Sequence, residues 1–388
     1  MVRWLGMACG LLLWVLVVGY GAVKKTPTFK WTGRWEKTDL VGAYHSYIKM
    51  EDGRVACFEN IGDAALNVSF TREPGNLLRW TPRAELMAFD AISDLPDPAD
   101  PTKPAANRFL TRPTVARLSN GDFLGLGVIC RDYPAVDGLR YVVSYTGTAE
   151  SVNVVKKALL AGQEPPKTAS WKYLGKVIGP VREYLEKQTY YSVYPGTYSL
   201  MFLPNGPATP DHARPTRNRF LAFSNYIGPP EPKKDVWLWT VLCYSADGRE
   251  WFVARDSTGA VRNLTSGYGD KKGYEFPFVF RRAADEWWMW RSAGFQGEEK
   301  FECMSCGYNE LFLYYSPDGL NWQLVRTDVV SNDVLGKDGK PLGLKNMSIY
   351  YDAETKQIHG MLSVRYEEED PSGPWWRKYH NVATVTRE

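Results

Sequence analysis

Short apolar segments separated by polar turns recur along the whole chain, and they come in pairs. In residues 43–58 the turn at 51–53 reads Glu-Asp-Gly, and in residues 111–127 the turn at 119–121 reads Ser-Asn-Gly. Two apolar segments joined by such a turn are typical of a β-hairpin. The same order of a polar or aromatic residue, an apolar segment, a turn and a second apolar segment recurs in residues 197–206 with 217–225, in 274–290 and in 345–363.

The five units follow one another at intervals of roughly 65 to 85 residues, which is the length of one propeller blade of four strands with its loops. This repeat predicts an all-β fold, a five-bladed β-propeller that forms a single domain over residues 23–388. The expected blade limits are roughly 38–95, 105–185, 190–262, 268–335 and 340–388.

A second element repeats in the third and fourth units. Residues 244–251 and 315–322 both read Tyr-Ser-x-Asp-Gly-x-x-Trp. Asp and Gly favour a tight turn, and the Trp that follows can pack back onto the blade. Tyr244 and Tyr315 are therefore expected at equivalent positions of two successive blades. A weaker counterpart in the first unit ends at Trp80.

The fifth unit is one strand short, because only the apolar segment at 375–386 follows its two inner strands. We expect residues 26–37, which include the aromatic sequence Phe-Lys-Trp-Thr-Gly-Arg-Trp-Glu-Lys at 29–37, to supply the missing outer strand. That arrangement closes the ring and covers an exposed sheet edge.

Composition agrees with one folded unit that is rich in aromatic residues. The 388 residues are 44% hydrophobic and 23% charged, and they include 15 Trp, 23 Tyr and 16 Phe. This composition excludes a disordered chain. The formal net charge of +3 provides no broad basic surface, so no nucleic-acid partner is expected.

Residues 1–22 have the features of a secretory signal peptide. Arg3 gives a short basic start, residues 9–18 form an apolar stretch, and small residues follow within 19–22. The apolar stretch is shorter than the roughly 20 residues that a transmembrane helix needs. We therefore expect a secreted or periplasmic monomer with no stable membrane insertion after cleavage.

Cysteine spacing predicts neither a metal site nor a cofactor. Cys303 and Cys306 form a Cys-x-x-Cys pair, which in an exported protein indicates a local disulfide. A structural zinc site would need two further ligands at a suitable spacing, and no second pair of this kind is present. Cys57, Cys130 and Cys243 lie in apolar segments, where buried thiols are expected.

The Ser-x-Asp-Gly-x-x-Trp turns, the five units and the leader resemble those of the five-bladed propeller glycoside hydrolases of the arabinanase, xylosidase and fructosidase type. The resemblance covers nearly all of residues 26–388 through the repeat pattern. It implies a carbohydrate substrate and hydrolysis of a glycosidic bond. Residues 112–124, which begin Arg-Pro-Thr-Val, are similar to the opening strand of the sialidases, although those proteins have six blades and turns one residue longer.

Functional residues are expected where the inner strands begin, because these positions converge from all blades on the propeller axis. The aligned positions are His45, Arg112, Tyr198, Glu275 and Asn346, with Tyr194 and Tyr274 close by in the sequence. The five-bladed hydrolases have an Asp in the first blade, an Asp in the second and a Glu in the third. His45, Arg112 and Tyr198 stand at the corresponding starts, so that triad does not carry over.

Glycosidic hydrolysis ordinarily uses two carboxyl groups. Glu275 is the carboxyl of the aligned positions, and Asp39, just upstream of the first inner strand, is a candidate base. His45 is a candidate acid because an imidazole with an ordinary pKa near 6.5 suits proton transfer. Asp132 and Glu59, expected on loops, are alternative carboxyl groups.

Substrate binding is assigned to five residues, Arg112, Tyr198, Tyr274, Asn346 and Tyr194. The predicted function is that of an exported glycoside hydrolase acting on a poly- or oligosaccharide. A polysaccharide lyase, with a Tyr or His base and Arg112 holding a uronate carboxylate, and a sialidase-like exo-enzyme are the enzymatic alternatives. A non-catalytic glycan-binding propeller is the third, and the missing Asp pair favours it.

Overall fold

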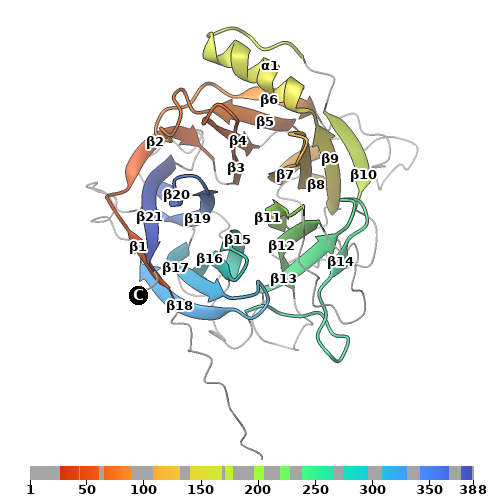
Figure 1. Cartoon of the computed structure of the whole chain (residues 1–388), viewed down its shortest axis with the longest axis vertical. Coiled ribbons are helices and arrows are strands. Elements are labelled where there is room, and N and C mark those ends of the chain that lie inside the picture. Colours follow the sequence, from red (N-terminus) through yellow and green to blue (C-terminus); the bar gives the residue numbers. More distant parts are fainter. Residues whose placement is uncertain are drawn as a thin grey trace, which may run out of the picture.

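The computed structural model shows five small β-sheets arranged in a ring around a central axis (Figure 1). It describes residues 27–42, 44–60, 65–88, 108–131, 140–167, 171–177, 196–204, 219–227, 238–265, 274–295, 308–329, 341–366 and 377–386. The predicted five-bladed β-propeller is confirmed.

Each of the first three blades is an antiparallel sheet of four strands in sequence order, with the first strand innermost (Figure 1). Blade one consists of β3 (His45–Lys49), β4 (Val55–Glu59), β5 (Ala65–Phe70) and β6 (Ala84–Ala88). Blade two consists of β7 (Arg108–Arg117), β8 (Phe123–Arg131), β9 (Arg140–Gly147) and β10 (Lys172–Lys176). Blade three consists of β11 (Gly196–Phe202), β12 (Phe220–Ile227), β13 (Leu238–Ser245) and β14 (Phe252–Val253).

The remaining strands form blades four and five. Blade four consists of β15 (Tyr274–Ala283), β16 (Glu286–Phe295), β17 (Tyr308–Ser316) and β18 (Gln323–Val329). Blade five consists of β19 (Pro341–Asp352), β20 (Gln357–Tyr366) and β21 (Arg377–Thr386), with β1 (Thr28–Trp31) and β2 (Glu36–Val41) along its outer edge.

The N-terminal segment closes the ring, as predicted. β1 pairs antiparallel with β21, from Thr28 opposite Thr386 to Trp31 opposite Ala383, and β2 pairs with an earlier stretch of the same strand. Phe29 is buried, and its ring contacts Trp288 and Trp290 of blade four. The first and last described strands therefore share one blade.

The hydrophobic core is divided among the interfaces between neighbouring blades. One cluster joins blades one and two, and further clusters join two to three, three to four, four to five and five to one. The four-to-five cluster holds Trp288 and Trp290 together with Phe29 and Trp35 of the N-terminal segment. Adjacent blades thus depend on each other for burial of their apolar faces.

The two Tyr-Ser-x-Asp-Gly-x-x-Trp elements form the same turn in blades three and four. Asp247 Oδ1 accepts hydrogen bonds from the backbone N–H groups of residues 249 and 250, at 2.8 and 2.9 Å. Asp318 makes the equivalent bonds at 2.8 Å each. Trp251 and Trp322 each donate Nε1–H to the carbonyl of the turn glycine at 3.0 Å. The predicted equivalence of the two elements is confirmed.

Replacement of the turn glycine should measure how closely blade three approaches blade two. Gly248 has φ +78°, and an added Cβ would lie 2.5 Å from Leu124 of blade two. We expect Gly248→Ala to lower the free energy of unfolding by about 2–5 kcal/mol, from left-handed strain and from overpacking. Gly259→Ala is the matched control, because φ is +85° there and an added Cβ meets no atom within 4 Å. Equal losses in urea unfolding would contradict the close approach.

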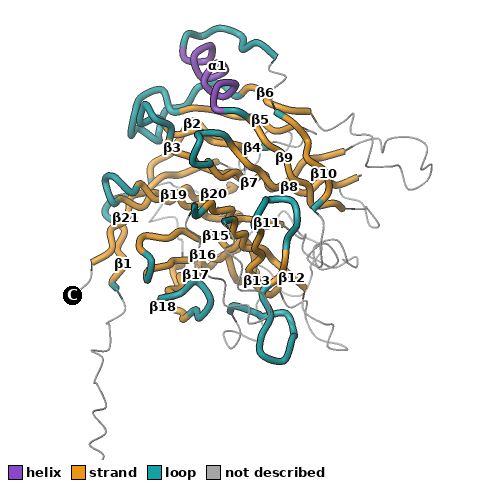
Figure 2. Tube along the Cα trace, turned by 45° about the vertical axis from the view of Figure 1, so that its right-hand side comes forward, coloured by secondary structure: helices purple, strands orange, loops and turns teal. Residues whose placement is uncertain are grey.

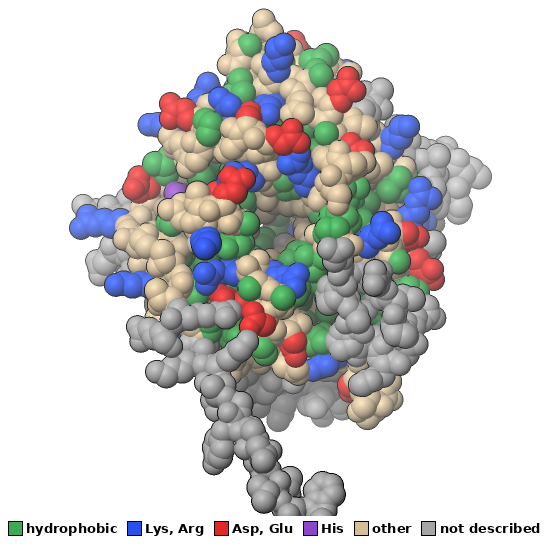
Figure 3. Space-filling view, viewed as in Figure 1, with side chains coloured by type: hydrophobic (Ala, Val, Ile, Leu, Met, Phe, Trp, Pro, Cys, Tyr) green, Lys and Arg blue, Asp and Glu red, His purple; other side chains and the backbone are tan. Residues whose placement is uncertain are grey.

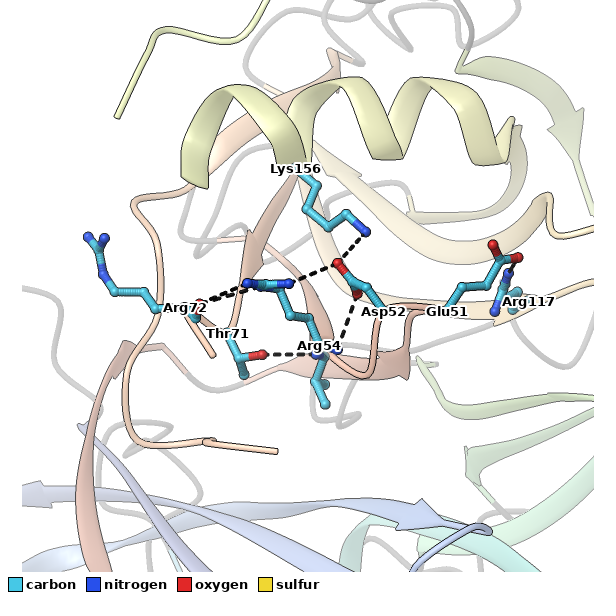
Figure 4. A network of polar contacts seen from close by, with 8 residues as sticks. Glu51, Asp52, Arg54, Thr71, Arg72, Arg117 and Lys156 are labelled. Atoms are coloured by element: carbon cyan, nitrogen blue, oxygen red, sulfur yellow. Dashed lines mark hydrogen bonds and ion pairs between the residues drawn. The ribbon is translucent and has the colours of Figure 1, made fainter. Parts of the chain in front are cut away.

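One helix, which the sequence pattern did not predict, lies at the outer rim beside β6 (Figures 1 and 2). α1 (Ala149–Leu160) begins after the N-cap Thr148 and buries Val152, Val155 and Leu159 against blades one and two. Lys156 of this helix donates to Asp52 at 2.8 Å, and Asp52 also accepts from Arg54 (Figure 4). Among the described residues, no helix is long and apolar enough to cross a membrane.

Candidate functional site

The five inner strands enclose a cavity on the propeller axis. It measures about 610 Å³, and residues of β3, β7, β11, β15 and β19 line it. Its lining begins with residues near the start of each strand, such as His45 and Thr114, and ends beyond the strand ends, at Ala284 and Glu354. Figure 3 looks onto the face that carries the tight turns, and this face is hollowed at its centre.

Four of the five inner strands carry an irregularity at the same level. The pairing with the second strand of each blade shifts between Thr111 and Thr114, between Thr197 and Ser199, between Glu275 and Phe278, and between Leu344 and Met347. Such β-bulges re-aim side chains and are enriched next to active sites. The first residues after the shifts in β7, β11 and β15 line the axial cavity. The bulges therefore mark the end of the cavity where the inner strands begin.

The predicted ring residues lie at these bulges. Arg112, Tyr198 and Asn346 fall between the shifted pairs, and Glu275 is the last regularly paired residue before its shift. The structure describes the backbone of Tyr198, Tyr274, Glu275 and Asn346 and leaves their side chains out, and Tyr194 lies outside the described residues. Their roles stay predictions, and so does the loop carboxyl Asp132, which also lies outside.

Arg112 combines a buried guanidinium with a rare backbone conformation. Its φ is +55°, and the residue is 3% exposed. Its guanidinium carbon lies 5.1 Å from the centre of the Tyr44 ring, a cation–π contact. Left-handed backbone at a non-glycine residue costs about 1–2 kcal/mol, and strain of this kind concentrates at functional sites. The geometry is that of a cation fixed in place at the bulge of β7.

Asp39 is not brought to the axis. It lies on β2 at the outer edge of blade five, where its carboxylate accepts from Arg79 at 3.0 Å and from the Trp80 N–H at 3.3 Å. It is absent from the described lining of the cavity. The predicted position is wrong because Asp39 precedes the first inner strand in sequence, whereas in space it belongs to the strand that closes blade five.

His45 lines the cavity, yet both of its ring nitrogens face protein groups. Nδ1 lies 2.9 Å from the Tyr47 hydroxyl, and Nε2 lies 3.2 Å from Glu59 Oε2. Glu59 is the last residue of β4 and is buried, so the expected loop position is wrong. Its other oxygen accepts from the Ser69 hydroxyl at 3.0 Å. Proton transfer from His45 to a ligand would require a nitrogen to leave its present partner.

Charges around His45 are shifted by burial. Burial lowers the pKa of the His45 imidazole, and the neighbouring Lys378 of β21 lowers it further. Burial also lowers the pKa of Lys378 to about 7. The Cys57 thiol has a pKa raised well above its usual value by burial and then by the Glu59 carboxylate. Cys57 and Cys243 are free, buried thiols, as predicted, and Cys303 and Cys306 lie outside the described residues.

The opposite end of the cavity carries ion pairs. Lys49 contacts Asp352 at 2.9 Å and Glu354 at 2.7 Å. Arg282 contacts Glu286 at 2.6 Å. These carboxylates are engaged at the turn face, away from the bulges, so we do not assign them to the candidate site.

The polar cluster around His45 was missed by the sequence interpretation, although a signal for it exists. β3 and β4 form a hairpin in which His45 is opposite Glu59 and Tyr47 is opposite Cys57. Side chains alternate between the faces of a strand, so these four residues share one face. A hairpin register counted outward from the Glu-Asp-Gly turn at 51–53 would have placed them together.

Comparison with solved structures identifies the fold. One match, described as a complex of BT0996 with RGII, has a TM-score of 0.55 and 11% identity, and the match covers 91% of this protein and 92% of the other. A second, described as "Glycoside hydrolase", has a TM-score of 0.54 and 12% identity over the same shares. A xylan β-1,4-xylosidase from Bacillus halodurans C-125 has a TM-score of 0.50 and 10% identity over 90% of this protein and 54% of the other.

The protein has the five-bladed propeller fold found in glycoside hydrolases of this structural type. This confirms the predicted resemblance at the level of the fold, and the described residues form five blades where sialidases have six. No protein family matches the sequence, and no curated protein is detectably similar to it.

Proposed function

We propose that this protein binds a poly- or oligosaccharide at the bulged end of its axial cavity and hydrolyses a glycosidic bond there. The observation that carries the proposal is the coincidence of two independent features. The positions selected from the sequence repeat lie at the bulges in β7, β11, β15 and β19. Fold-level similarity to glycoside hydrolases supports a carbohydrate ligand.

The proposed division of labour follows from the chemistry of each group. Glu275 supplies the general acid, which protonates the leaving oxygen. Arg112 binds a negatively charged or hydroxyl-rich sugar through its guanidinium. Tyr198, Tyr274, Tyr194 and Asn346 contribute stacking surfaces and hydrogen bonds. The proposed site of action is outside the cytoplasm, on the strength of the leader at residues 1–22.

A second candidate function is non-catalytic glycan binding. Hydrolysis ordinarily needs two carboxyl groups. Among the described residues, Asp39 lies at the periphery and Glu59 is held behind His45. These placements remove two of the carboxyl groups that the sequence offered as partners for Glu275.

A screen of plant and microbial poly- and oligosaccharides separates the two functions. Purified protein is incubated with each glycan, new reducing ends are measured, and binding is recorded on a glycan array in parallel. We expect at least one glycan to be both bound and cleaved. Binding without cleavage across the panel would favour the lectin-like function, and unsaturated products would identify a lyase. No binding to any glycan would contradict both carbohydrate proposals.

A further inference from the structure

Three side chains that commonly bind metal ions converge between blades one and five. His45, Cys57 and Glu59 each direct one ligand atom to a common region, and these atoms all lie within 4.8 Å of one another. All three residues are buried. The convergence follows from the hairpin, because His45 and Glu59 are directly opposite and Cys57 is two residues before Glu59 on the same face.

The hydrogen bonds around these residues leave one ligand atom of His45 and one of Glu59 directed inward. His45 Nδ1 is held by the Tyr47 hydroxyl, and Glu59 Oε1 is held by the Ser69 hydroxyl. His45 Nε2 and Glu59 Oε2 face each other at 3.2 Å, and neither makes a hydrogen bond of acceptable geometry. Metal-binding His and carboxylate groups are usually held through their second polar atom in this way.

We propose that His45 Nε2, Cys57 Sγ and Glu59 Oε2 bind a divalent transition-metal ion, with Zn²⁺ as the best match. A tetrahedral zinc site with bonds of about 2.0–2.2 Å places its nitrogen and oxygen ligands about 3.3 Å apart, close to the observed separation. Imidazole, thiolate and carboxylate are all zinc ligands. The prediction of no metal considered only Cys-x-x-Cys spacing, and this set is spread over two paired strands.

Charge balance agrees with a divalent ion. The Cys57 thiolate and the Glu59 carboxylate carry two negative charges, which neutralise the ion inside a buried site. Binding breaks the S–H bond of Cys57 and forms the S–metal bond, and the proton is released to solvent. Lys378 is the nearby positive group that the bound ion would have to compete with.

The ion has a route to the site and a structural effect there. His45 lies on the wall of the axial cavity, so the cavity brings solvent to the edge of the cluster. Three protein ligands leave one coordination position for water. The bound ion would tie β3 to β4 at the start of the inner strand of blade one.

The test uses the full chain, purified in the presence of a chelator and then titrated with Co²⁺, both as folded protein and during refolding. We expect one Co²⁺ per protein molecule, a thiolate-to-cobalt charge-transfer absorption band, displacement by Zn²⁺, and a higher melting temperature with Zn²⁺. Failure of the folded and refolded protein to bind Co²⁺ would overturn the proposal without reference to any variant.

Variants locate the site. Cys57→Ser should abolish the charge-transfer band, whereas Cys243→Ser, at another buried free thiol, and the double change Cys303→Ser with Cys306→Ser should retain it. Ser69→Ala, which leaves every ligand in place, should weaken binding by about 10- to 100-fold. Lys378→Met should strengthen it.

A band that persists in Cys57→Ser, or one that disappears with the Cys303 and Cys306 change, would place the ion elsewhere and overturn the assignment. If Cys57→Ser fails to fold, Ser69→Ala decides, since unchanged affinity there would equally contradict the site. These readouts are independent of glycan turnover, so failure of the carbohydrate proposal leaves the metal proposal standing.

Discussion

Replacement of Glu275 by Gln is expected to lower turnover of a responsive glycan by at least roughly 10²-fold while glycan binding persists. Gln keeps the size and much of the hydrogen bonding of Glu but cannot donate a proton to a leaving oxygen. A carboxyl that acts as an acid near neutral pH needs a raised pKa, which desolvation in a pocket supplies. The loss should therefore appear in kcat more than in KM.

The control for this change is Glu250→Gln, because Glu250 is exposed on the turn of blade three, at the face opposite the bulges. Its turnover should match that of the parent. Full activity of Glu275→Gln would remove Glu275 from the site. The alternative pairing of Asp39 with His45 is not supported by the positions of those residues, so the next candidates would be carboxyl groups on the connections between blades.

Much of the fold could be predicted because its signals are local. The Asp-Gly turns show themselves in eight consecutive residues, and the aromatic pattern of Phe29, Trp31 and Trp35 indicates a strand with a buried face. A missing strand in the last unit and a spare strand at the start then imply closure. Helix α1 escaped prediction because a single short helix of 12 residues does not disturb a repeat of blade length.

The candidate site was predicted less completely, because bulges and cross-strand pairs are not local signals. A bulge adds one residue without changing the apolar pattern around it, so the alignment could reach the level of Arg112 and Asn346 but not their orientation. Asp39 was misplaced for a similar reason, since closure moves its strand to another blade. His45 was interpreted as an isolated acid because its partners Glu59 and Cys57 become neighbours only through strand pairing.

Removal of residues 26–37 is expected to prevent stable folding at physiological temperature. The deletion takes away β1 and exposes the edge of β21. It also removes the buried Phe29 and Trp35 from the cluster between blades four and five, where Trp31 packs against them. Loss of a buried Phe or Trp costs about 3–5 kcal/mol, so two or three such losses approach the whole stability of a typical domain.

The N-terminal segment fits a space that the last blade keeps open for it. Gly360 of β20 faces the indoles of Trp31 and Trp35, and an added Cβ would lie 2.5 Å from Trp31 and 3.1 Å from Trp35. Thr32 donates both its N–H and its hydroxyl to the Val382 carbonyl at 2.8 Å. These contacts distinguish a packed strand from a terminal tail, which could be removed without effect.

Point variants test the same closure in a protein that still folds. Phe29→Ala should lower the free energy of unfolding by about 3–5 kcal/mol, whereas Lys30→Ala, at the next and exposed position of β1, should change it by less than about 0.5 kcal/mol. Both are measured by urea and thermal unfolding beside the deletion of 26–37. An unaltered melting temperature for the deletion, or equal effects of the two point changes, would show that the fifth blade does not depend on this strand.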